Sequence, residues 1–420
     1  ALIRKTNPSK QDYSTVFLVN VATGIFFYAL LCVGAPGISW FFNQPDLTPI
    51  IWVMGSTIVI NALSMVARVP LTKNMDFKSL ATISVISNIV SGAVAIVLAF
   101  KGWGVWSLVW RNIVQSVATT LLIFVFSRPS FGLQFSRASF REIFGFGSKL
   151  LMSRLFLEVY NNLYYLLIGK FFSARELGLY TRANGYKDMF SRTLHNVIQS
   201  VSFPALAEIK DDDERLKNAY RRLVQTTTYL TAILMFGLAA TADHFILGLI
   251  GPQWTDAIPY LQLLSIVGIF YPLHYINLNI LVIKGQSGKH LKLEFLTKLI
   301  AVPALFVGYF FGIIPMIICM IFTWSVDYLV TSSTSGELIN YPVKEQIKDI
   351  FPSFLFAVLL GAFVFLVGKI SPFHALVNLL IQVVSGFLFT VIVSNQFRIK
   401  PFLEIKEIVL QKFMKKPALG

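Results

Sequence analysis

Two stretches of this chain decide its fold: 154-RLFLEVYNNLYY-165 and 177-LGLYTRANGYKDMFSRTLHNVIQSVSFPA-205. Both are apolar enough to lie in a bilayer, yet both carry charged and amide side chains at helical spacing. The first set is Arg154, Glu158, Asn161 and Tyr165; the second is Asn184, Asp188, Arg192, His195 and Gln199. At about 100° per residue, each set occupies a stripe roughly 60–80° wide on its helix.

An ionisable side chain at membrane depth costs at least about 2.5–3.5 kcal/mol, so it normally faces a partner or a hydrated cavity. Two aligned stripes therefore favour a membrane protein that handles a polar cargo. A second interpretation stays open. Arg154 with Glu158, and Asp188 with Arg192, are spaced i,i+4, so both pairs can close into internal salt bridges on their own helices.

The rest of the chain fits the membrane setting. Apolar residues make up 55% of it and charged residues only 14%, whereas soluble domains are about 25% charged. Apolar blocks of about 20 residues, long enough to cross the hydrocarbon layer, recur throughout. We predict an all-α polytopic bundle of about twelve transmembrane helices, near 16–40, 50–71, 80–100, 105–127, 146–170, 177–205, 222–250, 258–283, 290–311, 313–335, 350–369 and 374–394.

Lys and Arg are distributed very unevenly between the gaps. One alternating set of gaps, together with both ends of the chain, holds 26 of them, and the other set holds four: Lys101, Lys170, Arg175 and Lys369. Basic loops stay in the cytoplasm, so we expect both ends of this chain to be cytoplasmic. The net charge of +15 then reflects topology and anionic membrane lipids, and argues against nucleic-acid binding.

Motifs for catalysis are missing from the sequence. The run 285-GQSGK-289 lacks the spacing of a phosphate-binding loop, and the five histidines show no zinc-ligand spacing. The acidic run 211–214 is most simply a solvated loop, and the amphipathic segment 396–416 is expected on the inner membrane surface. We therefore expect a transporter without catalytic residues, metal or cofactor.

Several runs carry a resemblance to a known family. They are 167-LIGKFF-172, 177-LGLYTRA-183 and 203-FPAL-206, supported by 245–257 and by 1-ALIRK-5 leading to 14-STVF-17. Together they resemble the bacterial polysaccharide flippases, the Wzx-like members of the multidrug/oligosaccharidyl-lipid/polysaccharide exporter superfamily. The resemblance covers nearly the whole chain and implies a multi-pass protein of the bacterial inner membrane.

The resemblance implies fourteen helices in two six-helix lobes plus two trailing helices, with two helices preceding Ala1. It also implies alternating access for an undecaprenyl-diphosphate-linked oligosaccharide during surface polysaccharide synthesis, beside a polymerase and chain-length proteins. On this basis we divide the chain into the remainder of the N-terminal lobe (1–127), a cytoplasmic linker (128–145), a six-helix C-terminal lobe (146–335), two trailing helices (350–394) and a basic tail (395–420).

A lipid-linked sugar needs cations for its diphosphate and amides or hydroxyls for its sugars. The predicted roles follow from this chemistry. Arg154, Arg192 and Arg182 would contact phosphate; Asn161, Tyr165, Asn184 and Gln199 would contact sugar; Asp188, Glu158 and Asp327 would couple an ion. Two alternatives stay open: a cation-coupled drug antiporter of the same superfamily, and a membrane-embedded enzyme of cell-envelope assembly.

Overall fold

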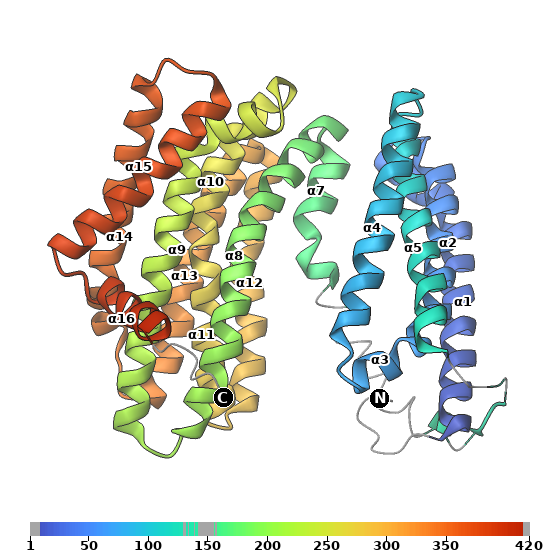
Figure 1. Cartoon of the computed structure of the whole chain (residues 1–420), viewed down its shortest axis with the longest axis horizontal. Helices are drawn as coiled ribbons and strands as arrows, with labels where there is room; N and C mark the ends of the chain where they lie inside the picture. Colours follow the sequence, from blue (N-terminus) through green and yellow to red (C-terminus); the bar gives the residue numbers. More distant parts are fainter. Residues whose placement is uncertain are drawn as a thin grey trace. The chain divides into compact units, whose positions relative to one another are not determined.

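A computed structural model describes residues 9–128, 132, 134–137, 139–141, 155 and 158–414 of this chain. These residues form helices joined by short turns, and no strand occurs among them (Figure 1). The chain divides into two compact units, Ala1–Asn161 and Asn162–Gly420. Each unit is described separately below.

The first unit contains α1 (Lys10–Phe42), α2 (Leu47–Ala67), α3 (Val69–Lys73), α4 (Phe77–Phe100) and α5 (Val105–Ser127). A capping box starts α1: the Ser9 hydroxyl accepts from the Asp12 backbone N–H, and the Asp12 carboxylate accepts from the Ser9 N–H. Helix α2 packs against both α1 and α5, and α4 packs against α5. A close approach at Gly24, where an added Cβ would lie 3.0 Å from the Cβ of Ala62, sets the α1–α2 spacing.

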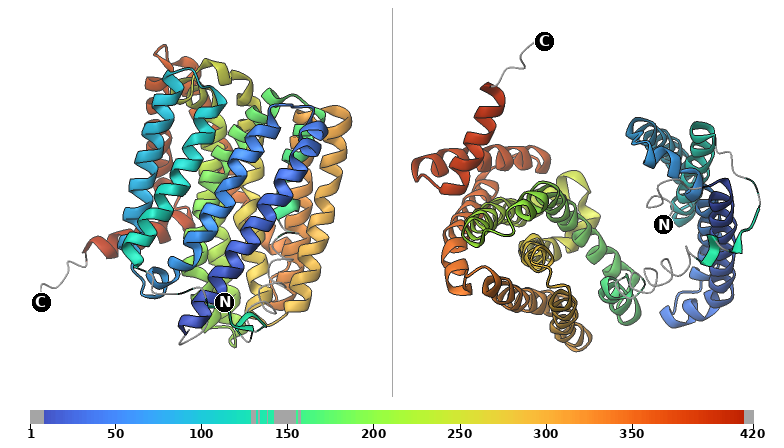
Figure 2. Two further views of the ribbon diagram at one scale, coloured as in Figure 1. Left: turned by 90° about the vertical axis from the view of Figure 1, so that its right-hand side faces the viewer. Right: turned by 90° about the horizontal axis from the view of Figure 1, so that it is seen from below.

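The second unit is larger. It contains α7 (Leu163–Phe171), α8 (Ala174–Glu208), α9 (Asp213–Leu249), η1 (Pro252–Ala257), α10 (Ile258–Gly268), α11 (Phe270–Ile283), α12 (Ser287–Phe311), α13 (Ile313–Leu338), α14 (Val343–Ile370), α15 (Ala375–Gln396) and α16 (Lys400–Met414). Helix α9 packs against α8, α10, α14 and α15, and Figure 2 (right) shows this bundle from one end. Helix α16 is seen end-on in Figure 1, so it lies across the direction of the long helices.

The predicted fold class is confirmed. Ten helical segments in the described part of the chain are long and apolar enough to cross a membrane, and they match ten of the twelve predicted spans. The other two are the polar ones. In 146–170, residues 146–154, 156 and 157 lie outside the described part, and α7 within the remainder has only 9 residues. The 177–205 segment forms α8, whose 35 residues extend about 52 Å, but its many charged residues keep it out of the apolar set.

The span that contains α10 and α11 is interrupted in its middle, and the interruption involves α8. Pro272 has no N–H, so the carbonyl of Gly268, four residues earlier, loses its usual helical donor. The Ser191 hydroxyl of α8 donates to that carbonyl at 2.7 Å. A backbone group freed inside a membrane must find another partner, and Ser191 therefore joins α8 to the bend.

Helices α14 and α15 are attached to α9 by a buried polar contact. His244 Nδ1 lies 2.9 Å from Gln382 Oε1, and Gln382 also donates to the Val364 carbonyl at 3.0 Å. Gly368 provides the room, because an added Cβ would lie 2.0 Å from the Gln382 amide nitrogen. The trailing pair is thus an integral part of the second unit.

Candidate functional site: the polar face of α8

Helix α8 begins with its own capping box, in which Ser173 and Glu176 exchange hydrogen bonds. Its polar residues recur at intervals of three or four, as the sequence predicts, and so share one face. That face divides by exposure: Asn184 is buried, Asp188 is partly buried and Arg192 is exposed. The three form a gradient from packed core to open surface along about two helical turns.

Asp188 is the centre of this face. Its carboxylate lies 2.7 Å from Lys187 Nζ and 3.0 Å from an Arg192 guanidinium nitrogen, and the Asn184 amide donates to it at 3.4 Å. Two cations around one carboxylate leave a formal charge of +1. The side chains of Lys187 and Asp188 are 11% and 19% exposed, whereas that of Arg192 is 57% exposed. The excess positive charge is therefore available at Arg192.

The i,i+4 pair of Asp188 and Arg192 is thus present, as the internal salt-bridge interpretation requires. That interpretation explains the buried side of the cluster. It leaves the exposed guanidinium of Arg192 unexplained, because a side chain needed only to neutralise Asp188 would duplicate Lys187. Lys187 was not predicted, since it lies about 100° from the stripe.

Tyr165 and Asn184 are brought together from α7 and α8. The Asn184 amide donates to the Tyr165 hydroxyl at 2.6 Å, and the Tyr165 ring meets Tyr180 edge-on with centroids 5.7 Å apart. The two predicted sugar contacts therefore form one hydrogen-bonded unit beside Asp188.

Aromatic rings of α11 border the face. The Arg192 guanidinium carbon lies 5.6 Å from the centroid of the Tyr271 ring, within cation–π range. His195 contacts both Tyr271 and Tyr275, at centroid distances of 5.4 and 4.7 Å. Further along, Gln199 and Asn279 exchange amide hydrogen bonds of 3.2 and 2.5 Å. Asn279 was not predicted, because only the fold places it opposite Gln199.

Asp327 lies deeper in the second unit. Its carboxylate is 2.8 Å from His274 Nδ1, and both side chains are less than a tenth exposed. Trp324 covers the imidazole edge-on at 5.8 Å. Asp327 therefore does not share the open surface of Arg192.

The remaining predicted residues lie elsewhere. Arg182, on the exposed surface of α8, has its guanidinium 5.3 Å from the Trp254 ring of η1. Glu158 and Asn161 are helical and belong to the first unit. Arg154 lies outside the described residues.

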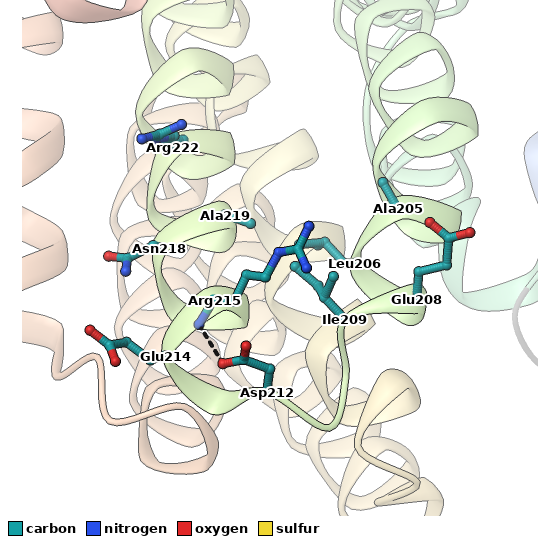
Figure 3. A pocket seen from close by; sticks show the side chains of 10 residues that line it. All are labelled: Ala205, Leu206, Glu208, Ile209, Asp212, Glu214, Arg215, Asn218, Ala219 and Arg222. Carbon is teal, nitrogen blue, oxygen red and sulfur yellow. Dashed lines mark hydrogen bonds between the residues drawn. The ribbon is translucent and has the colours of Figure 1, made fainter.

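A separate pocket of about 640 Å³ opens where α8 ends and α9 begins (Figure 3). Arg215, Arg222 and Asn218 line it together with the acidic Glu208, Asp212 and Glu214. Asp212 caps α9 by accepting from the Arg215 N–H at 3.0 Å, and Asp213 is 2.5 Å from Lys284 Nζ. Two residues of the predicted acidic loop thus stabilise the turn.

A sequence profile for the family described as polysaccharide biosynthesis protein matches residues 1–259. The chain belongs to this family. Among curated relatives, the teichuronic acid biosynthesis protein TuaB of Bacillus subtilis is 25% identical over 68% of the chain. The lipopolysaccharide biosynthesis protein WzxC of Escherichia coli is 25% identical over 73%. The succinoglycan biosynthesis transport protein ExoT of Rhizobium meliloti is 27% identical over 63%.

The matched region spans 60%, 63% and 54% of these three relatives, in the same order. Among solved structures, the inward closed conformation of the lipid II flippase MurJ superposes with a TM-score of 0.71. The superposition covers 94% of this chain and 87% of the MurJ chain, and the two sequences are 14% identical. That likeness establishes the fold. With the apolar helices, these comparisons make the chain a multi-pass bacterial membrane protein.

Proposed function

We propose that this chain forms part of a flippase that moves an undecaprenyl-diphosphate-linked oligosaccharide from the cytoplasmic to the outer leaflet during surface polysaccharide synthesis. The observation that carries the proposal is the exposed guanidinium of Arg192. It is held by Asp188 beside the buried Lys187, on a helix long enough to span the membrane.

The chemistry of the substrate fits this face. The polyprenyl tail is at home in lipid, whereas the diphosphate and the hydroxyl-rich sugars require water or polar side chains. A guanidinium binds phosphate oxygens with forked, permanently charged donors. Asn184 and Tyr165 lie on one side of Asp188, and Gln199 lies further along α8 beyond Arg192, so sugar-binding groups flank the cation.

The drug-antiporter alternative is disfavoured by charge. A cationic drug needs a free carboxylate, but Asp188 is already neutralised by two cations. We also propose that Arg154 and Arg182 contact phosphate and that Asp327, Asp188 or Glu158 couples an ion. We further propose alternating access between the predicted domains, with both ends of the chain in the cytoplasm. A polymerase, chain-length proteins and anionic membrane lipids are the proposed partners.

The test is the sidedness of a labelled lipid-linked oligosaccharide in vesicles that contain the full-length protein. We expect label to reach the far leaflet with wild type, and at least about tenfold more slowly with Arg192→Ala, since a charge-assisted contact contributes about 1.5–3 kcal/mol. Arg154→Ala is tested alongside. Arg175→Ala is the matched control, because Arg175 pairs with Asp256 at the far end of α8.

Unchanged flipping in both Arg154→Ala and Arg192→Ala would overturn the phosphate-contact assignment. The enzyme alternative is tested in the same samples. Chemical turnover of the lipid-linked sugar by purified protein in detergent would favour an assembly enzyme, whereas a flippase leaves the substrate intact.

A further inference from the structure

The pair of His274 and Asp327 is unusual for its position. His274 lies on α11 within the candidate membrane span Pro252–Ile283, and Asp327 lies on α13, which is itself such a span. Their side chains are 5% and 8% exposed and are joined at 2.8 Å. Intramembrane ionisable groups are expensive and commonly mark proton or ion pathways. A role in packing alone would be served as well by an apolar pair.

The surroundings favour a proton over a metal cation as the ligand. A hard cation takes six or more oxygen ligands, but Asp327 Oδ2 is already engaged by the imidazole. No group of three or more His, Cys, Asp or Glu side chains that could hold a metal occurs in the described part of the chain. An imidazole hydrogen-bonded to a carboxylate can gain and lose one proton.

Other titratable groups approach the pair from the neighbouring helices. Lys298 of α12 interacts electrostatically with Asp327 and also with Glu294. His195 of α8 interacts in the same way with His274. Tyr275 of α11 and Tyr220 of α9 complete the set: the Tyr275 ring meets His274 at 5.0 Å, and Tyr220 bonds to Asn277, one turn from His274.

A continuous series of contacts joins the buried pair to the exposed face of α8. The Tyr275 ring contacts the His274 ring. It also contacts the rings of His195 and Tyr271, with centroids 4.7 and 4.9 Å away. Tyr271 in turn lies under the Arg192 guanidinium. All these groups belong to the second unit. A change of charge at the pair is therefore separated from Arg192 by packed rings, with little water to screen it.

We propose that His274 and Asp327 form a proton-binding site whose occupancy sets the affinity of the Arg192 face for an anionic head group. With one proton on the imidazole, the pair carries a charge of −1; a second proton, taken from solvent, makes it neutral. The neutral pair no longer repels an anion, so protonation tightens binding. By linkage, binding of the anion raises proton uptake by the same factor. The linkage part rests on the proposed function.

The proton site itself can be tested without substrate. Trp324 packs against His274, so its fluorescence should report the charge of the imidazole. This signal is the difference between the wild type and Trp324→Phe. We expect that signal to change reversibly with pH, and the change to be lost in His274→Gln and shifted in Asp327→Asn. A pH-independent signal in the wild type would overturn the site, whatever the substrate is.

The linkage is tested by calorimetry in detergent, with a short-chain polyprenyl-diphosphate oligosaccharide as the probe, in buffers of different ionisation enthalpy. We expect proton uptake on binding, and about fivefold tighter binding at pH 6 than at pH 8. His274→Gln should bind without proton uptake, and Asp256→Asn should behave as wild type.

Proton uptake that persists in His274→Gln would overturn the linkage. If the probe does not bind to wild type while the Trp324 signal still titrates, then the proposed function fails and the proton site stands. If the probe binds and the signal does not titrate, the reverse holds.

Discussion

Two pairs of ionisable side chains in the second unit differ in their exposure, and this difference separates their roles. Asp188 and Arg192 lie on α8 with the guanidinium 57% exposed, whereas His274 and Asp327 lie between α11 and α13 and are less than a tenth exposed. Both pairs occupy segments of membrane-spanning length. An intramembrane charge can contact a ligand directly only where it reaches a surface. A buried pair must therefore act through its neighbours.

The exposed pair is also the better supported of the two by packing. Lys187, Asn184 and Arg192 all reach the Asp188 carboxylate, and the absence of a side chain at Gly268 makes room for the Lys187 stem. If Asp188 is the structural centre and Arg192 the outward-facing group, variants on the buried side should lower stability and variants on the exposed side should lower binding.

The largest expected effect is that of Asp188→Asn, because it leaves Lys187 buried without its counterion. Breaking a buried pair on one side costs about 3–5 kcal/mol. We expect a loss of that size in the free energy of unfolding, measured by denaturant titration in detergent micelles. The double variant Lys187→Met/Asp188→Asn should recover most of the loss. A single variant as stable as wild type would show that Lys187 reaches water.

Gly268→Ala should have the next largest effect. An added Cβ would lie 2.7 Å from the Met235 sulfur and 2.9 Å from Cγ of Lys187, and overpacking of this kind costs about 1–3 kcal/mol. Gly237→Ala on α9 is the matched control, since an added Cβ there meets nothing within 4 Å. Equal unfolding free energies for the two variants would contradict the close approach of α8 to the bend.

Ser191→Ala removes the hydroxyl that satisfies the Gly268 carbonyl. One such hydrogen bond contributes about 1 kcal/mol, and the variant should be destabilised by that amount. Ser200→Ala serves as the control, because the Ser200 hydroxyl bonds only to the Val197 carbonyl of its own helix. If the control loses as much stability as Ser191→Ala, then the bend does not depend on α8.

The smallest effect concerns Gln199 and Asn279. Their amides are only partly buried, and interhelical polar pairs in membranes contribute about 0.6 kcal/mol on average. A double-mutant cycle of Gln199→Ala and Asn279→Ala should give a coupling energy of about that size. A coupling of zero, combined with weaker sugar binding, would assign these amides to the substrate alone.

Much of this site could be predicted from the sequence. Helical periodicity alone places Asn184, Asp188 and Arg192 on one face, and their i,i+4 spacing gives the salt bridge. Lys187 was missed because it lies off the stripe, and it reaches Asp188 only by extending its stem past Gly268.

Contacts between helices could not be read from periodicity. Asn279 and His274 lie about eighty residues from their α8 neighbours, and only the packing of α11 against α8 brings them there. A usable signal for the buried pair did exist. His274 and Asp327 are isolated ionisable residues on two apolar spans. Because burial of either alone is costly, the sequence predicts that they pair with each other.

Cysteine accessibility tests most directly whether the Arg192 face is open to the head group while the His274–Asp327 pair is closed to it. In a Cys32→Ser/Cys319→Ser background, Arg192→Cys and Asp327→Cys are compared for their rates of reaction with a water-soluble thiol reagent, with and without lipid-linked oligosaccharide. We predict rapid labelling at position 192 that the substrate slows, and slow labelling at position 327 that it leaves unchanged. Slow labelling at 192, or rapid labelling there that the substrate does not slow, would contradict the assignment of this face to the head group.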